Sequence, residues 1–120
     1  MSKTILLVED DELIRQSLAR VLTTKGLKVI QATNGKEGLE SAANADLVVT
    51  DVRMPEMDGL QMVDALRKDP KTKELPIIIL SNDEEASTLN KALEAGVTVY
   101  LSKSNQDADS LADQILAAAG

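Results

Sequence analysis

Five short apolar segments alternate along the chain with longer segments that have the spacing of amphipathic helices. The apolar segments are residues 4–8, 28–32, 46–50, 77–80 and 98–101. The first, third and fourth are apolar without alternation, which is typical of central parallel strands covered by helices on both faces. The second and fifth are more mixed, as edge strands are. The pattern therefore predicts an α/β fold with a five-stranded parallel sheet.

A helical pattern follows each predicted strand. These patterns cover residues 13–22, 35–43, 60–67, 84–95 and 106–118, and Gly26 is a typical stop for the first. A strand followed by a helix five times over predicts a (βα)₅ doubly wound sheet with right-handed crossovers. At 120 residues and 43% hydrophobic content, we expect one domain over residues 1–120, with no output domain after it.

Composition excludes several classes of function. The formal net charge of -7 opposes contact with phosphate backbones, so we expect no direct binding to nucleic acid. The chain has no cysteine, which excludes disulfides and thiolate metal sites and is compatible with a reducing cytosol. It contains no apolar run long enough for a membrane span. We therefore expect a cytoplasmic protein without a membrane partner.

Polar side chains stand where the predicted strands end. Glu9 and Asp10 follow the first strand, Asp51 the third, Ser81 the fourth and Lys103 the fifth. In a doubly wound sheet, ligands bind beyond these carboxyl ends. If the first and third strands are neighbours, the acidic side chains converge and repel each other unless a cation lies between them. Oxygen ligands without histidine or cysteine favour a hard ion such as Mg²⁺.

With these strand ends and the stretch "VVTDVRMPEMDG" at residues 48–59, the chain resembles a response-regulator receiver domain of the stand-alone chemotaxis type. The resemblance covers essentially the whole chain and implies a flavodoxin-like sheet of strand order 2-1-3-4-5. It implies that Asp51 is the phosphoacceptor and that Glu9, Asp10, Asp51 and the backbone carbonyl of Arg53 bind Mg²⁺. It further implies phosphate contacts from Ser81 and Lys103.

The resemblance also implies a function. Asp51 would take a phosphoryl group from a sensor histidine kinase or a histidine phosphotransfer protein, which makes the chain a phosphoacceptor switch and not an enzyme in the usual sense. Ser81 and Tyr100 would be the switch residues. They would reshape the face built by the fourth helix, fifth strand and fifth helix for a downstream protein target, which the sequence does not name.

Each of these residues also has a structural explanation when it is taken singly. Asp10 or Asp11 can N-cap the first helix, and we expect Asp11 to do so; Ser81 can cap the fourth helix, and Lys103 can be a solvated surface charge. Tyr100 can be edge-strand packing. The joint placement of two acids, a hydroxyl and a lysine at separate strand ends favours the functional interpretation.

Three alternative functions differ in what they require. A phosphohydrolase with an aspartate nucleophile needs a second aspartate two residues on, where Arg53 stands. A calcium-binding loop at "DADSLADQ" from Asp107 lacks the third acidic position and the glycine of an EF-hand. A pseudo-receiver that binds a partner without phosphorylation stays open.

Ser104 is the clearest departure from the family pattern, which usually has proline after the lysine, joined through a cis bond. A cis bond before a non-proline residue costs about 2.5 to 4 kcal/mol, so we expect a trans Lys103–Ser104 bond. Ser104 or Asn105 is then free to cap the last helix, whose first turn carries Asp107 and Asp109.

Overall fold

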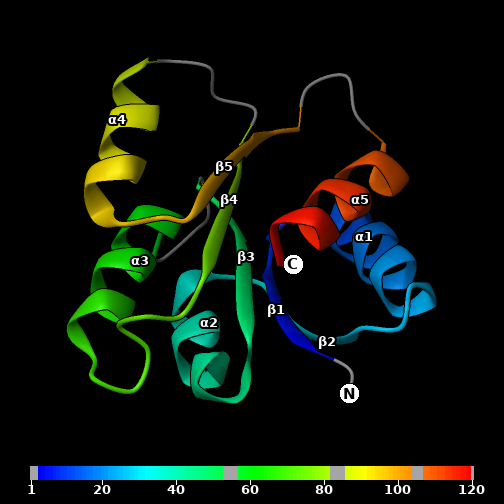
Figure 1. Ribbon diagram of the computed structural model, residues 1–120, viewed down its shortest axis with the longest axis horizontal. Coiled ribbons are helices and arrows are strands. Elements are labelled where there is room, and N and C mark those ends of the chain that lie inside the picture. Colours follow the sequence, from blue (N-terminus) through cyan, green and yellow to red (C-terminus); the bar gives the residue numbers. More distant parts are fainter. Residues whose placement is uncertain (1–2, 53–56, 82–85, 104–106, 120) are drawn as a thin grey trace.

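The computed structural model describes residues 3–52, 57–81, 86–103 and 107–119 (Figure 1). Its strands are β1 (Thr4–Val8), β2 (Lys28–Ala32), β3 (Leu47–Asp51), β4 (Ile77–Ser81) and β5 (Val99–Ser102). Its helices are α1 (Glu12–Thr24), α2 (Gly35–Ser41), the 3₁₀ helix η1 (Ala42–Asn44), α3 (Gly59–Lys68), α4 (Ala86–Ala95) and α5 (Ala108–Ala119). Strands and helices alternate in the order that the sequence predicts.

All strand pairs are parallel and the sheet has the order β2-β1-β3-β4-β5, which confirms the predicted fold class. The bounds of β1 and β2 are also as predicted. By contrast, β3, β4 and β5 each continue one residue further than the apolar pattern predicts. Asp51 pairs with Leu80, and Ser81 pairs with Ser102. Strand pairing uses backbone groups, so it runs on into the polar positions that end the hydrophobic pattern.

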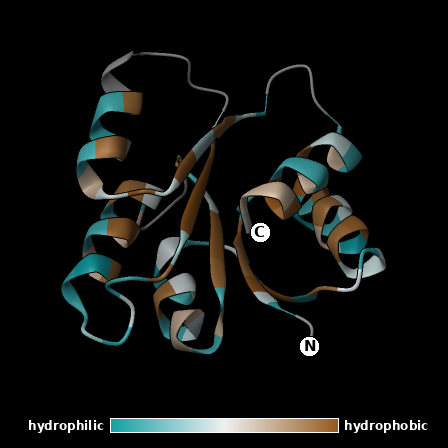
Figure 2. Cartoon of the chain, viewed as in Figure 1, coloured by the Kyte–Doolittle hydropathy of each residue, from teal (hydrophilic) through white to brown (hydrophobic). Residues whose placement is uncertain are grey.

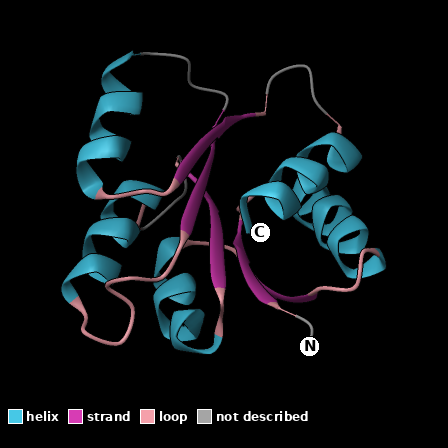
Figure 3. Ribbon diagram, viewed as in Figure 1, coloured by secondary structure: helices cyan, strands magenta, loops and turns pink. Residues whose placement is uncertain are grey.

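The sheet lies between two layers of helices, with α1 and α5 on one face and α2, α3 and α4 on the other (Figures 1 and 3). Successive strand residues point to opposite faces, so two apolar clusters form. One contains Leu6, Val8, Val48, Ile77 and Ile79; the other contains Ile5, Leu7, Val49, Ile78 and Leu80. The strands are consequently the most uniformly hydrophobic part of the chain (Figure 2). This burial on both faces explains why the central strands do not alternate.

Helix ends follow capping chemistry, with one difference from expectation. Asp11 N-caps α1 as predicted, because its Oδ1 accepts a hydrogen bond of 3.1 Å from the Ile14 amide. Gly26 ends α1 with a φ of 93°, which favours glycine. At α5, Asp107 Oδ1 accepts from the Ser110 amide at 2.8 Å. Asp107 therefore caps α5, which begins at Ala108, two residues later than the sequence predicts. The predicted caps Ser104 and Asn105 lie outside the described residues.

Candidate functional site

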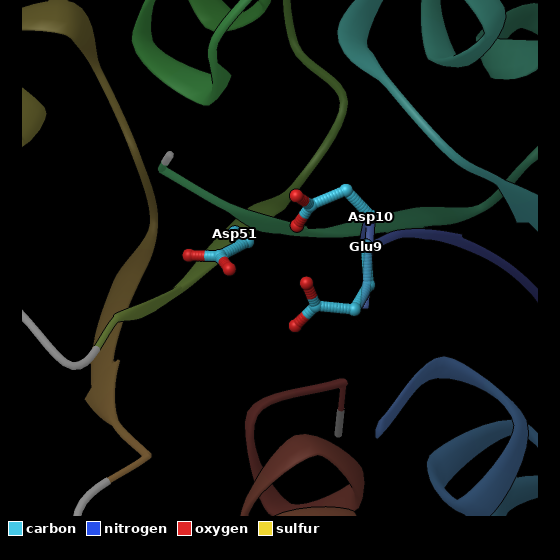
Figure 4. A group of neighbouring side chains, drawn as sticks. All are labelled: Glu9, Asp10 and Asp51. Carbon is cyan, nitrogen blue, oxygen red and sulfur yellow. The ribbon is translucent and has the colours of Figure 1, made fainter. Parts of the chain in front are cut away.

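Three carboxylates meet at the carboxyl edge of the central strands. Glu9 and Asp10 directly follow β1, and Asp51 is the last residue of β3. Val8 pairs with Thr50, so Glu9 and Asp51 occupy the next matching positions of the two neighbouring strands. One oxygen from each of Glu9, Asp10 and Asp51 lies within 4.8 Å of the others. Figure 4 shows the carboxylates of Glu9 and Asp10 extending toward the side where Asp51 lies.

Lys103 joins two of these carboxylates. Its Nζ lies 2.8 Å from Glu9 Oε1 and 2.8 Å from Asp51 Oδ2. The exposed fractions of the three side chains are 8% for Lys103, 3% for Glu9 and 13% for Asp51. Burial removes these charges from water, so the attraction within this group is stronger than at a surface. The alternative that Lys103 is a solvated surface charge is therefore wrong.

Backbone groups hold the acidic side chains in place. The Asp11 amide donates to Glu9 Oε2 at 3.2 Å, and the Val52 amide donates to Asp51 Oδ1 at 2.7 Å. The guanidinium of Arg15, on α1, donates to the Glu9 carbonyl oxygen at 3.1 Å. The two amides orient the carboxylates of Glu9 and Asp51, and Arg15 holds the backbone of Glu9. Asp10 is the exposed member of the group.

The electrostatics of the pair follow from burial and proximity. Burial raises the pKa of Glu9 to about 7, and the negative charge of Asp51 adds to this, although the hydrogen bond from Lys103 acts in the opposite direction. For Lys103, burial alone would lower the pKa. The hydrogen bonds and charges of Asp51 and Glu9 outweigh this and raise the pKa above its ordinary value, so the ammonium stays charged at neutral pH.

Ser81 and Tyr100 lie on the strands that border this group. Ser81 ends β4, is 2% exposed, and its carbonyl accepts a hydrogen bond of 3.0 Å from the Lys103 amide. It therefore stands between Asp51 and Lys103 at the strand ends. Tyr100 pairs with Ile79, further back along the sheet, and its half-buried ring packs on the cluster under α2, α3 and α4.

Two predicted features of the site lie outside the described residues. These are the backbone carbonyl of Arg53 and the peptide bond between Lys103 and Ser104. Asp107 and Asp109 are described, and they belong to the cap and first turn of α5. A helix there agrees with the absence of an EF-hand signature from the sequence.

Sequence reasoning missed two contacts. It assigned Lys103 only to phosphate, whereas the ammonium also pairs with Glu9. It did not single out Arg15, because an arginine inside an amphipathic helix is ordinary. The available signal was positional: Arg15 lies one helical turn after the cap Asp11, so it faces back toward the end of β1.

The donor set fits a hard divalent cation. All three side chains offer carboxylate oxygens, and Asp10 is exposed, so the group is open to water and to a phosphate ligand. Mg²⁺ is bound in proteins through one or two carboxylates together with waters and phosphate oxygens. Lys103 already balances part of the negative charge, so a single divalent ion matches what remains.

Fold and site together define a class: a flavodoxin-like α/β domain with an acidic pocket at the β1/β3 switch point of its sheet. The chain belongs to the response regulator receiver domain family, whose family model matches residues 5–115. Receiver domains are regulatory phosphoacceptor domains and not dedicated enzymes. The family binds Mg²⁺ in an acidic pocket, and its members interact with histidine kinases and downstream targets.

Individual relatives agree with this assignment. Chemotaxis protein CheY1 of Helicobacter pylori is 37% identical over 103 residues, which is 82% of this chain and 83% of that protein. Response regulator MprA of a Mycobacterium species is 40% identical over 105 residues, 86% of this chain but 45% of that protein. The structure of chemotaxis response regulator CheY4 of Vibrio cholerae matches with a TM-score of 0.89 and 28% identity, covering 98% of this chain and 99% of that one.

No helix in the described part of the chain is long and apolar enough to cross a membrane.

Proposed function

We propose that this chain is a cytoplasmic signalling switch that accepts a phosphoryl group on Asp51 from a histidine kinase or a histidine phosphotransfer protein. The observation that carries the proposal is the buried Lys103 ammonium, 2.8 Å from both Asp51 and Glu9, at the edge of an acidic group open to water. An ordinary surface aspartate has no such buried cation beside it. A cation beside Asp51 supports the proposal, because a phosphoryl group on Asp51 would need positive charge next to it.

The proposed reaction is a transfer between nitrogen and oxygen. A carboxylate oxygen of Asp51 attacks phosphorus of a phosphohistidine, so an O–P bond forms as the N–P bond breaks. The imidazole nitrogen keeps the electron pair and takes a proton from solvent. Lys103 then gives up its contact with Asp51 Oδ2 for a phosphoryl oxygen, and the Ser81 hydroxyl donates to another. The product is an acyl phosphate.

Glu9, Asp10 and Asp51 would hold Mg²⁺, together with the backbone carbonyl of Arg53. When bound, the ion neutralises the charge that develops on the phosphoryl oxygens. The residues of the chain supply the remaining requirements. The Val52 amide orients Asp51 at 2.7 Å, and the Asp11 amide orients Glu9 at 3.2 Å, so neither carboxylate must be reorganised during transfer.

The output is a surface change. Ser81 would move toward the phosphoryl group and Tyr100 would turn inward, which alters the face of α4, β5 and α5. On α4, Leu89 is 38% exposed and Leu93 is 55% exposed, so this helix offers apolar surface to a downstream protein. The net charge of -7 disfavours nucleic acid as the direct target. Phosphorylation shifts the population of two states only by its differential affinity for them.

A phosphorylation assay tests this function. The chain is incubated with a small acyl-phosphate donor, with and without Mg²⁺, and intact mass is recorded. We expect one added phosphoryl group that requires Mg²⁺ and is absent from Asp51→Asn. Asp64→Asn is the matched control, because Asp64 pairs with Lys68 on the surface of α3, and it should be phosphorylated normally.

Three results would contradict the proposal. Phosphate on Asp51→Asn would show that another residue is modified. No phosphate on the wild-type chain from this donor or from a phosphorylated histidine phosphotransfer protein would favour a pseudo-receiver. Steady release of phosphate from small phosphomonoesters would favour a phosphohydrolase.

A further inference from the structure

Gly35, the first residue of α2, touches the segment that follows Asp51. Its amide donates a hydrogen bond of 3.1 Å to the carbonyl oxygen of Met57. A Cβ at position 35 would lie 2.6 Å from this oxygen and 2.9 Å from Met57 Cγ. Because the first of these atoms belongs to the backbone, no side-chain rotation relieves the contact. Position 35 therefore has room only for glycine while Met57 keeps its place.

Gly59, two residues after Met57, lies in close contact with the backbone of Asp51. The Gly59 amide donates to the Val52 carbonyl at 2.8 Å, and a Cβ at position 59 would collide with the carbonyl oxygen of Asp51. Asp58, between Met57 and Gly59, is the N-cap of α3 and exchanges capping-box bonds with Gln61. The backbone from Met57 to Gly59 is thus fixed to the end of β3 on one side and to α2 on the other.

α2 has little freedom to move out of the way. A Cβ at Gly38, one turn later, would lie 2.6 Å from Met62 Sδ and 3.0 Å from Val8 Cγ2, so the helix is packed closely against α3 and β1. Its first turn is also held, since Asn34 Oδ1 accepts from the Glu37 amide at 2.9 Å. A displacement at the Gly35 contact would therefore fall mainly on Met57 and the residues bonded to it.

We propose that Gly35 is a positioning residue for the phosphoacceptor, acting through Met57 and Gly59 on the backbone of Asp51. The inference rests on the proposed function of Asp51. It adds that α2, which contributes no side chain to the acidic group, determines where the carboxylate of Asp51 stands relative to Glu9 and Lys103. A shift of about 1 Å at such a group can lower a reaction rate by up to about a hundredfold.

The first test uses the wild-type chain. It has six glycines, so selective ¹⁵N-glycine labelling yields few amide resonances to follow during a titration with Mg²⁺. We expect Gly59 and Gly35 to shift together with one dissociation constant. Gly26 and Gly96 lie at the ends of α1 and α4 and should not move. If Gly59 shifts and Gly35 does not, the inference is wrong while the metal site stands. If no glycine shifts, the proposed metal site fails, and the inference with it.

The second test compares Gly35→Ala with Gly38→Ala. Both add one methyl group to the same helix, but the methyl at position 38 meets the side chains of Met62 and Val8 and not the Met57 backbone. We expect Gly35→Ala to lower the saturating rate of phosphorylation by a small-molecule donor about tenfold. The donor concentration at half-saturation should change little. Gly38→Ala should lose stability but keep its rate within roughly twofold.

Two results overturn the assignment. One is a Gly35→Ala rate within roughly twofold of the wild-type rate. The other is an equal loss of rate in Gly38→Ala, because the effect would then be general destabilisation of α2. If Gly35→Ala does not fold, the glycine titration of the wild-type chain decides alone.

Discussion

Two cationic side chains lie at opposite ends of the sheet and are compensated in different ways. Lys103, at the carboxyl ends of the strands, is held by the carboxylates of Glu9 and Asp51. Arg67, at the end of α3, is held by backbone carbonyls near the starts of β4 and β5. Its Nη2 and Nε donate to Gly96 O at 2.8 and 3.1 Å, and its Nη1 donates to the carbonyls of Leu75, Lys73 and Thr72 at 2.8, 3.0 and 3.3 Å.

The difference lies in what can replace each cation. The partners of Arg67 are uncharged backbone carbonyls, so this guanidinium connects the loop before β4 to the end of α4. Carboxylates can also bind metal ions, so we expect Lys103 to share its partners with Mg²⁺. The first arrangement stabilises the fold, and the second provides a site whose charge can be redistributed.

Replacing Arg67 should have the largest effect on stability. Arg67→Ala removes a donor from four carbonyl groups, of which only Thr72 keeps another donor that we identify, the Leu75 amide. We expect the free energy of unfolding to fall by about 3 kcal/mol. Urea denaturation measures this. The dissociation constant for Mg²⁺ should stay unchanged in the folded variant. Arg67→Lys should recover less than half of the loss, because one ammonium cannot span both Gly96 and Leu75.

Arg20→Ala, which removes an exposed arginine from α1, is the control and should be neutral. A loss in Arg67→Ala no greater than in Arg20→Ala would mean that the carbonyl contacts contribute nothing.

Lys103→Met should have a smaller effect that depends on metal. Without Mg²⁺, the variant leaves Glu9 and Asp51 close together with no cation between them. We expect the free energy of unfolding to fall by about 2 kcal/mol and no further, because Glu9 can take up a proton and so lose its charge. Saturating Mg²⁺ should restore part of it, so the rise in melting temperature on adding Mg²⁺ should exceed that of the wild-type chain. Thermal unfolding followed by circular dichroism measures both.

Lys91→Met, at an exposed position of α4, is the control for loss of a lysine. An Mg²⁺-induced rise in Lys103→Met equal to or below the wild-type rise would show that the two cations do not share their ligands.

Mg²⁺ affinity should depend on pH through Glu9. Its pKa is raised to about 7, so a proton competes with the ion at neutral pH, and affinity should increase about tenfold from roughly pH 6 to pH 8. Without metal, the stability of the fold depends on pH in the opposite direction to the Mg²⁺ affinity. Protonated Glu9 favours the folded state, so its contribution to stability is complete below about 4.5 and is lost as pH rises to about 7.

Asp51, Lys103 and Arg15 also face Glu9, and Lys103 keeps its charge in this range because its pKa is raised. Titration calorimetry at several pH values measures the affinity. Glu9→Gln should bind weakly with no slope, whereas Asp10→Asn should bind weakly and keep the slope. An equal slope in Glu9→Gln would assign the proton to another group.

The sequence predicted the layers and the site because both depend on patterns that parallel sheets impose. Unbroken apolar runs occur where helices cover both faces, and residues after such runs meet at one edge. This placed Glu9, Asp10, Asp51, Ser81 and Lys103 near one another. The pairing of Lys103 with Glu9 was not predictable, because it depends on side-chain direction and burial. The contacts of Arg67 were not predictable either, because backbone carbonyls have no sequence signature.

The cap of α5 gives the smallest expected effect and shows how local ambiguity limits prediction. Ser104, Asn105 and Asp107 are all good N-cap residues, so composition alone could not choose among them. The hydrogen bond of 2.8 Å from the Ser110 amide identifies Asp107. We expect Asp107→Ala to lower the free energy of unfolding by about 1 kcal/mol. Asp109→Ala removes an exposed charge from the first turn of α5, and it should lower the free energy of unfolding by less than half of this amount. Neither variant should change Mg²⁺ affinity, because neither side chain belongs to the acidic group at β1 and β3. Chemical denaturation with and without Mg²⁺ measures both quantities. Equal losses in the two variants would mean that the charge near the helix end matters and the cap bond does not.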